Sequence, residues 1–296
     1  MRPDNHRRIA AFCALAWAMS LVLTGCATTD SPGSATREAP PPALQQIAAR
    51  LPGGYVSVRK DDRSAQTLDI AHRPGETHDK LKLSMVQQDI DGGNIRRYGL
   101  ELEPTAVENR LDGRFALLDE DDRVQRSCPM RFHLTDKGLV GETEPGDCLF
   151  GQGPEVVGLL KEILFDGRRI TIGDRLIDPD SGESRGDDRV IDFLPAPVFD
   201  GWLGVREGGE WRVARSFELR AGQAVEPQDA ADMSLGHRVE LQYYRMERND
   251  SAILMRLSVV DSESGEVTAE AWAEPGSSNL GVALPDLQVG LGAQER

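Results

Sequence analysis

Apolar and polar residues alternate with a period of two in many short segments of this chain. The alternation is clearest over 81–86, 97–103 and 130–134, and turn-forming Gly, Pro, Asn and Asp residues lie between these segments. Because successive side chains of a strand point to opposite faces, the pattern predicts strands with one buried face. Further strand-like runs cover 55–58, 114–118, 139–143, 162–165, 169–172, 210–219, 238–248, 252–260 and 267–274.

A helical period occurs near the start of this series. Leu44, Ile47, Ala48 and Leu51 share one face of a helix over 43–51, which Pro52-Gly53-Gly54 ends. The segment 156–164 fits either a strand or a helical turn. Many short strands with little helix predict an all-β fold, an antiparallel barrel or sandwich.

Two hairpins are predicted from turn residues between paired strands. Asp136-Lys137-Gly138 and Asp166-Gly167-Arg168 are the turns. If Leu134 pairs with Leu139, the same register sets Cys128 opposite residue 145, and a bend at 145–146 would bring Cys148 to Cys128.

The N-terminal segment has the pattern of an export signal. Arg2, Arg7 and Arg8 precede an apolar run over 9–23 that is too short to span a bilayer. Leu23-Thr24-Gly25-Cys26 resembles the lipobox of bacterial lipoproteins, which implies cleavage before Cys26 and lipid attachment to it. An uncleaved anchor and an ordinary secretory signal are the alternatives. Ala27, rather than Asp, favours the outer membrane, facing the periplasm.

Charge and cysteine content fit an exported protein. Removal of residues 1–25 takes away three Arg and one Asp, so the net charge moves from -15 to -17, which disfavours nucleic acid as a partner. The cleaved chain then contains Cys128 and Cys148 in addition to the lipidated Cys26. In an oxidising compartment this even pair favours a disulfide, with two separate buried thiols as the alternative. By closing this loop, the disulfide would stabilise the folded protein by about 3 kcal/mol.

The segment from Cys128 to Glu183 resembles the CpcT/CpeT-type chromophore lyase family, whose members help attach linear tetrapyrroles to phycobiliproteins. The residues that carry the resemblance are Cys128, the alternating strand after it, Gly141 to Cys148, and Asp174 to Pro179. It implies a calycin-like antiparallel β-barrel, open at one end and often paired into a homodimer. The stretch after Cys148 lacks the family's Tyr, and Leu176 replaces a glycine, so the resemblance supports the fold more than the lyase activity.

The chain therefore divides into four predicted regions. These are a signal peptide (1–25), the lipidated Cys26 with a flexible linker (26–42), a β-barrel (43–212) and a C-terminal antiparallel meander (213–296). The meander either completes the barrel or forms an appended sheet.

Four residues are candidates for ligand binding: Arg97, Tyr98, Arg131 and His133. Arg96 and Arg97 lie beside Tyr98, and a guanidinium can bind a carboxylate through two parallel hydrogen bonds, although an outward-facing basic pair is the alternative. No hydrolase, metalloprotease, Walker or dinucleotide motif is present, so the sequence assigns no catalytic residue, metal site or cofactor.

Other polar clusters favour structural explanations. His72 and His78 lie near Glu76 and Asp79, and Asp178, Asp180, Glu183, Asp187 and Asp188 crowd one segment. Solvated loops and turns account for them better than a metal site does. Trp202, Trp211 and Trp272 are predicted to pack in the core or at its rim.

These observations favour a binding module. The predicted function is a membrane-tethered periplasmic barrel that holds a small apolar or tetrapyrrole-like ligand without catalysis. The alternatives are a lyase-like or chaperone-like handler of a linear tetrapyrrole, and a structural envelope protein whose barrel is filled.

Overall fold

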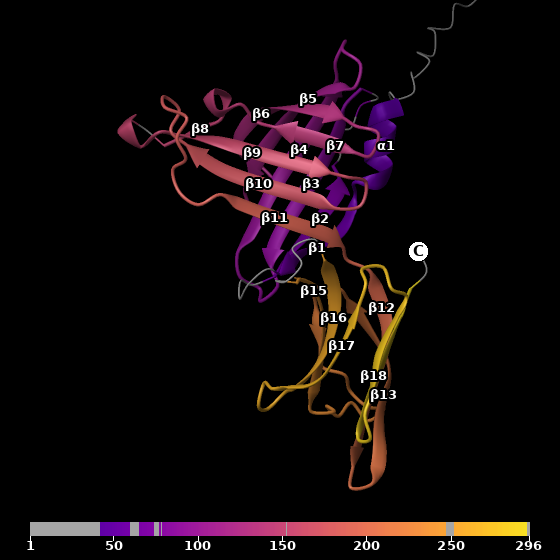
Figure 1. Cartoon of the computed structure of the whole chain (residues 1–296). Coiled ribbons are helices and arrows are strands. Elements are labelled where there is room, and N and C mark those ends of the chain that lie inside the picture. The colour runs from indigo at the N-terminus through magenta and orange to yellow at the C-terminus, as the bar shows by residue number, and fades with distance from the viewer. Residues whose placement is uncertain are drawn as a thin grey trace, which may run out of the picture. The chain divides into compact units, whose positions relative to one another are not determined.

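Ten strands close into an antiparallel barrel in the computed structural model, which describes residues 42–59, 65–73, 77, 79–151, 153–246 and 252–294 (Figure 1). In order around the barrel they are β1 (Gly53–Arg59), β2 (Gln66–His72), β3 (Leu81–Asp89), β4 (Ile95–Pro104), β5 (Arg110–Leu118), β6 (Val124–Leu134), β7 (Leu139–Glu142), β9 (Val157–Phe165), β10 (Ile170–Ile177) and β11 (Arg189–Pro195). Pairing of Tyr55 with Pro195 and of Ser57 with Phe193 joins β11 to β1 and completes the ring. The predicted all-β barrel is confirmed.

The disulfide is confirmed, and it forms as the hairpin register predicted. Leu134 pairs with Leu139, and the 3₁₀ turn η1 (Pro145–Asp147) bends the chain after β7. Cys128 and Cys148 are bonded, with their Cα atoms 5.1 Å apart. The short β8 (Leu149–Phe150) then runs beside β9. The ambiguous segment 156–164 lies mostly in the strand β9, and the turn η2 (Gly153–Glu155) precedes it.

The helix α1 (Pro42–Arg50) covers one end of the barrel. Leu44 and Ile47 are buried, as is Leu51 directly after the helix, and the Tyr55 hydroxyl donates a hydrogen bond of 2.8 Å to the Leu51 carbonyl. These side chains join a core built from the inward positions of the strands. Its largest fully buried members include Phe165, Phe193, Leu68, Leu83, Met85, Leu100, Leu102, Met130, Leu139 and Ile163.

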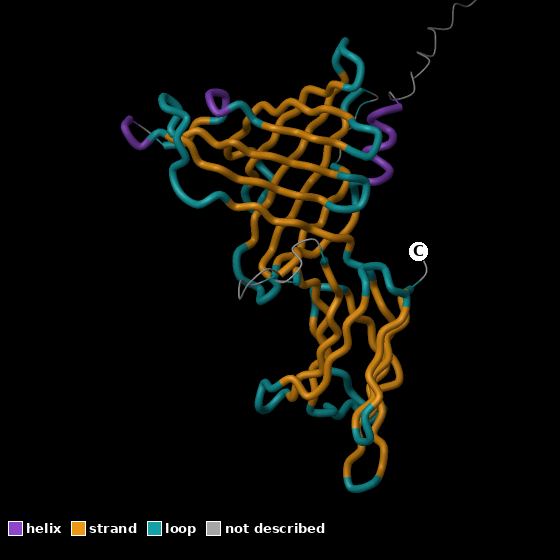
Figure 2. The backbone as a smooth tube through the Cα atoms, in the orientation of Figure 1, coloured by secondary structure: helices purple, strands orange, loops and turns teal. Residues whose placement is uncertain are grey.

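Two further sheets follow the barrel (Figure 2). One contains β13 (Glu210–Arg220), β12 (Val198–Glu207), β19 (Leu287–Ala293) and β18 (Asn279–Ala283) in that order. The other contains β14 (Ala224–Val225), β15 (His237–Arg245), β16 (Ile253–Asp261) and β17 (Val267–Ala273), and it is joined to the barrel sheet because the end of β1 pairs in parallel with β15, Val58 with Tyr243. Side chains of both sheets, such as Phe199, Leu203, Leu241 and Leu257, form a second core, so this part is a β-sandwich.

The barrel ends earlier than predicted. Residues 198–212, which we assigned to the barrel, form β12 and the start of β13 in a separate sheet, and the barrel closes without 213–296. The sequence hides this boundary because β11 and β12 are both apolar and only Ala196 and Pro197 separate them. Strand identity depends on partners far along the chain, which local periodicity does not reveal.

The remaining predictions about the N-terminus concern residues outside the described ones. These are the signal segment, Cys26 and most of the linker. Within the described part of the chain, no helix has the length and apolar character needed to cross a bilayer.

Candidate functional site

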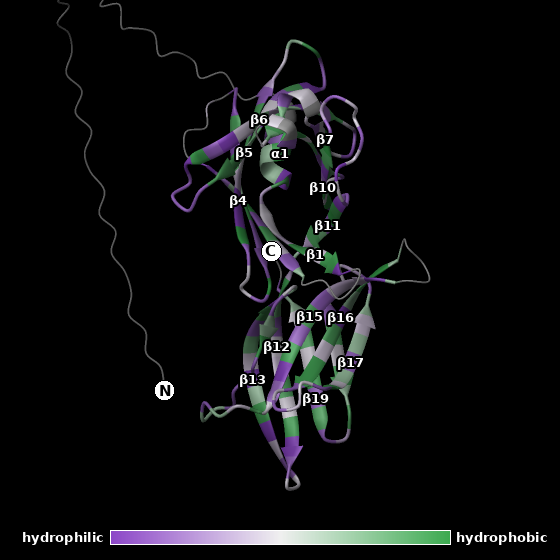
Figure 3. Ribbon diagram, turned by 90° about the vertical axis from the view of Figure 1, so that its left-hand side faces the viewer, coloured by the Kyte–Doolittle hydropathy of each residue, from purple (hydrophilic) through white to green (hydrophobic). Residues whose placement is uncertain are grey.

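Charged residues occupy inward positions at the end of the barrel opposite α1. On β9 the inward phase contains Phe165, Ile163 and then Lys161, so the interior changes from apolar to charged along a single strand. Figure 3 views the ring of barrel strands from this end, with α1 at the far side.

Lys161 is buried and paired. Its Nζ lies 2.6 Å from Oδ1 of Asp174, directly opposite on β10, and the side chain is only 4% exposed whereas that of Asp174 is 33% exposed. The same Nζ lies 5.4 Å from the ring centroid of Tyr98 and 4.6 Å from that of Phe115. Burial lowers the pKa of Lys161, and the nearby Asp174 carboxylate opposes that shift.

Two guanidinium groups lie beside this pair. Arg96 occupies the inward position next to Tyr98 on β4. Arg189 on β11 is the residue opposite Asp174 in the register of β10 and β11. Burial raises the pKa of Tyr98, while the charges of Arg96 and Arg189 oppose the shift. Both arginines are half-buried, and neither forms an ion pair with a carboxylate of the described residues.

The other inward carboxylate here, Asp89, is already satisfied. It accepts hydrogen bonds from the Gln66 side chain at 2.6 Å and from the Asn94 side chain at 3.1 Å. The bond from Gln66 is the main reason why the pKa of Asp89 is lowered. Gln87 donates to Gln66 in turn, at 2.6 Å. Arg96 also lowers the pKa of Asp89 through its charge and shares a side-chain hydrogen bond with Tyr98, so Arg96 and Arg189 are inward guanidiniums that lack an ion pair within the described residues but not all polar contacts.

Apolar side chains surround the cations at this end. Leu159 and Leu176 pair across β9 and β10 on the inward phase, and Phe150 pairs with Val157 on that phase. Leu176 lies on the inward phase beyond Asp174, the last residue of β10 that pairs with β11, and it is 43% exposed, so solvent reaches the inward face of β10 at this end. Arg126, also on the inward phase, lies 4.5 Å from the Phe150 ring centroid.

Of the four predicted ligand-binding residues, only Tyr98 faces the interior. Arg97 lies on the opposite face of β4, because its neighbour Arg96 shares the phase of Tyr98. Arg131 is exposed on the outer face of β6 and forms an ion pair of 2.6 Å with Glu144. His133 is exposed on the same outer face, opposite Val140 on β7.

Lys161 and Asp174 were missed, although the sequence contained a signal for both. The hairpin around Asp166-Gly167-Arg168 pairs Phe165 with Ile170, and the same register sets Lys161 opposite Asp174. Both residues occupy positions that are otherwise apolar on the two strands of this hairpin. A lysine opposite an aspartate at such positions indicates an ion pair inside the fold.

The acidic segment after β10 is used for turns and ion pairs. Asp178 accepts backbone hydrogen bonds from Asp180 and Ser181, each at 3.0 Å, and pairs with Arg185. These contacts, the Ser181 bond first, lower the pKa of Asp178 to about 2. Asp188 pairs with Arg175 at 3.0 Å. Among the residues that the structure describes, no three His, Cys, Asp or Glu side chains form a metal-binding group.

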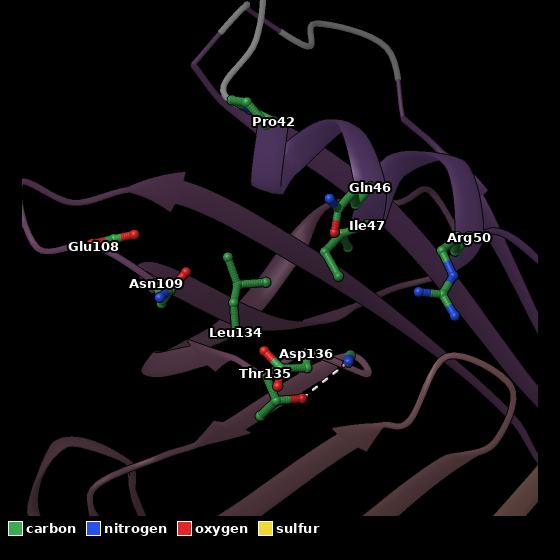
Figure 4. A pocket seen from close by; sticks show the side chains of 10 residues that line it. Pro42, Gln46, Ile47, Arg50, Glu108, Asn109, Leu134, Thr135 and Asp136 are labelled. Atoms are coloured by element: carbon green, nitrogen blue, oxygen red, sulfur yellow. Dashed lines mark hydrogen bonds between the residues drawn. The ribbon is translucent and has the colours of Figure 1, made fainter.

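A separate pocket of about 560 Å³ lies beside α1 (Figure 4). Ile47 and Arg50 from the helix and Leu134 from the end of β6 contribute to its walls. Glu108 and Asp136 are the carboxylates of its lining, and Arg50 is engaged by the Gly167 carbonyl at 3.2 Å. With two carboxylates and an occupied cation, this pocket offers less to an anionic ligand than the open end does.

No protein-family model matches the chain, and no curated protein matches it.

Proposed function

We propose that the barrel binds a small molecule with an apolar body and at least one carboxylate, at the end opposite α1. The observation that carries this proposal is the presence of two inward guanidiniums, Arg96 and Arg189, without carboxylate partners among the described residues. They lie beside Leu176, an inward side chain that solvent reaches. In this proposal the barrel acts as a binding module.

Charge supports an anionic group on the ligand. The chain as a whole carries a net charge of -15, yet the inward residues around Tyr98 include Arg96, Lys161 and Arg189 against the two carboxylates of Asp174 and Asp89. A guanidinium binds a carboxylate through charge-assisted hydrogen bonds, which are stronger in a partly desolvated site. An anion would therefore concentrate at this end of the barrel.

Shape and lining support an apolar body. Ligand sites combine mostly apolar walls with a few polar groups, and Phe150, Leu159 and Leu176 supply such walls here. Side chains can just fill the interior of a barrel of about eight strands, and a barrel of ten strands is wider than that. Linear tetrapyrroles, which the sequence resemblance suggests, carry carboxylates on an apolar conjugated frame and belong to the proposed class.

Thiol chemistry has no role in this proposal. Cys128 and Cys148 are bonded to each other, so neither sulfur is available as a nucleophile in the oxidised protein.

Paired ligands test the proposal. We expect palmitate to bind the mature chain about 10-fold or more tighter than hexadecanol does, and biliverdin to bind with a change in its absorption spectrum, because only the carboxylates engage the guanidiniums. The double variant Arg96→Gln, Arg189→Gln should lose this preference. Arg131→Gln, on the outer face, is the matched control. Equal affinities of the two C16 ligands, or an unchanged double variant, would reject the site.

We also propose that Cys26 carries lipid and tethers the protein to the outer membrane, facing the periplasm. The support is the lipobox-like sequence Leu23-Thr24-Gly25-Cys26 after a short apolar run. Metabolic labelling with a palmitate analogue should mark the wild-type protein and not Cys26→Ala. Label that persists in the variant would contradict the assignment.

A further inference from the structure

Two tryptophans lie exposed on one face of the sandwich. Trp202 on β12 is 41% exposed and Trp211 on β13 is 42% exposed, so of the two predicted places, core or rim, neither side chain is in the core. Leu203 and Val205, on the other phase of β12, are buried in the second core. The tryptophans therefore occupy the outer face of the sheet β13-β12-β19-β18.

Glycines underlie both indole rings. A Cβ atom added to Gly290, opposite Trp202 on β19, would lie only 2.4 Å from the indole Nε1. A Cβ atom at Gly204 would lie 3.3 Å from Cε3 of Trp211. Each ring thus covers backbone that has no side chain, which holds the ring low on the sheet and leaves its outer face accessible.

The two rings are spaced for a ligand with more than one ring. Trp202 covers β19 at its own level, and Trp211 covers β12 two residues farther along, at Gly204. The two indole rings are therefore offset by one strand spacing and by two residues along the strand, which gives a ring separation of about 8 Å. A single small ring does not fill that span, whereas two or more linked rings do.

The face between the indoles carries no charged side chain, although Arg206, opposite Trp211, bounds it on the same side of the sheet. Its outward positions are Gly204, Gly281, Gln288 and Gly290, and the amides of Gln288 and of Asn279 on β18 supply donors and acceptors beside the rings. On a chain with a net charge of -15, this patch fits an uncharged ligand rich in hydroxyl groups and disfavours anionic lipid or nucleic acid.

We propose that Trp202 and Trp211 form a binding face for a neutral glycan. The faces of pyranose rings present C–H groups, polarised by the ring oxygens, to the negative face of an indole, while their hydroxyls remain at the edges for amide side chains. Two carboxylates at the end of the face, Asp200 and Glu218, are held in place, because the Gln294 side chain donates to them at 2.8 Å and 3.3 Å. This glycan site is independent of the proposed barrel ligand.

Binding of neutral oligosaccharides tests the proposal. The full-length protein is solubilised in lauryldimethylamine oxide, which has no sugar head group, and titrated with cellohexaose and chitohexaose by calorimetry and by tryptophan fluorescence. We expect at least one of them to bind and to be weakened about 10-fold or more by Trp202→Ala or Trp211→Ala. Trp272→Ala is the matched control, because Trp272 is also 41% exposed but lies on β17 of the other sheet.

A second variant separates ring position from folding. Gly290→Ala leaves both indoles in the chain but displaces that of Trp202, so it should weaken glycan binding with an unchanged far-ultraviolet circular dichroism spectrum. Absence of binding to both hexasaccharides overturns the proposal. It is also overturned if the two tryptophan substitutions instead abolish binding to phosphatidylglycerol vesicles or self-association in sedimentation, which would assign the face to a membrane or to a second copy.

Discussion

Nζ of Lys161 lies 2.6 Å from Oδ1 of Asp174, and the lysine is the more deeply buried partner. The pair joins β9 to β10 at the level where the barrel interior changes from apolar to charged. A buried ion pair costs desolvation, and removal of one partner leaves the other charge uncompensated.

Asp174→Asn should therefore destabilise the protein by about 3 kcal/mol, because it leaves the Lys161 ammonium buried without a counter-charge. The double variant Lys161→Met, Asp174→Leu should lie within about 1 kcal/mol of the wild type. Urea unfolding followed by circular dichroism measures both. Glu144→Gln, which breaks the exposed pair with Arg131, is the control and should cost less than about 1 kcal/mol. If Asp174→Asn costs no more than this control, the buried pair has no special role.

The disulfide should contribute measurably to stability. It closes a loop with a sequence separation of 20 residues, so Cys128→Ser, Cys148→Ser should lower the free energy of unfolding by about 3 kcal/mol. Guanidinium unfolding with and without reductant gives the comparison, and reduced wild type should match the double variant. Alkylation of either cysteine in unreduced, native protein would contradict the bond.

Phe132 depends on two glycines on neighbouring strands. A Cβ atom at Gly141 would lie 2.0 Å from its ring, and one at Gly113 would lie 2.4 Å from it. Gly141→Ala should destabilise the barrel by about 1–3 kcal/mol, because the buried ring has no room to move. Gly146→Ala is the control, since a Cβ atom there meets nothing within 4 Å. Thermal unfolding compares the two, and equal midpoints would mean that the ring relocates freely.

Asp178 should make stability depend on acid pH. Its pKa falls from 3.8 to about 2 on folding, so the folded state favours the carboxylate form. The resulting stabilisation is present above pH 3.8 and is lost as the pH falls through about 2. Asp178→Asn should therefore flatten the stability profile between these values, as measured by urea unfolding at a series of pH values. Parallel profiles of the variant and the wild type would show that the contacts to Ser181 and Arg185 do not act through charge.

Local patterns predicted the strands better than they predicted their partners. The alternation over 81–86, 97–103 and 130–134 lies within β3, β4 and β6, and the turn at Asp136-Lys137-Gly138 set the register that places Cys128 near Cys148. Closure of β1 on β11 and the switch to a second sheet at Val198 were not predictable in this way, because both depend on contacts between segments far apart in the chain.

The candidate site was only partly predictable for a related reason. Tyr98 was identified, but Arg97 was chosen where the period of two selects Arg96. Arg189 was not singled out, since its position depends on pairing with Asp174 across a long loop. The exposed surface of Trp202 was also unexpected. Composition suggests that a tryptophan is buried, and only the pairing of β12 with the glycine-rich β19 shows which face it occupies.

Because the first and last strands close the barrel, the free edges of β1 and β11 become paired only late in folding. Tyr55 and Pro195 must meet before the second edges of β1 and β11 pair with each other, so a chain emerging from its N-terminus exposes the β1 edge at residues 55–57 until residue 195 is available. Such long-range pairing is slow to form. Aggregation is therefore a hazard of the incomplete barrel more than of the native one, and refolding yield should fall as protein concentration rises.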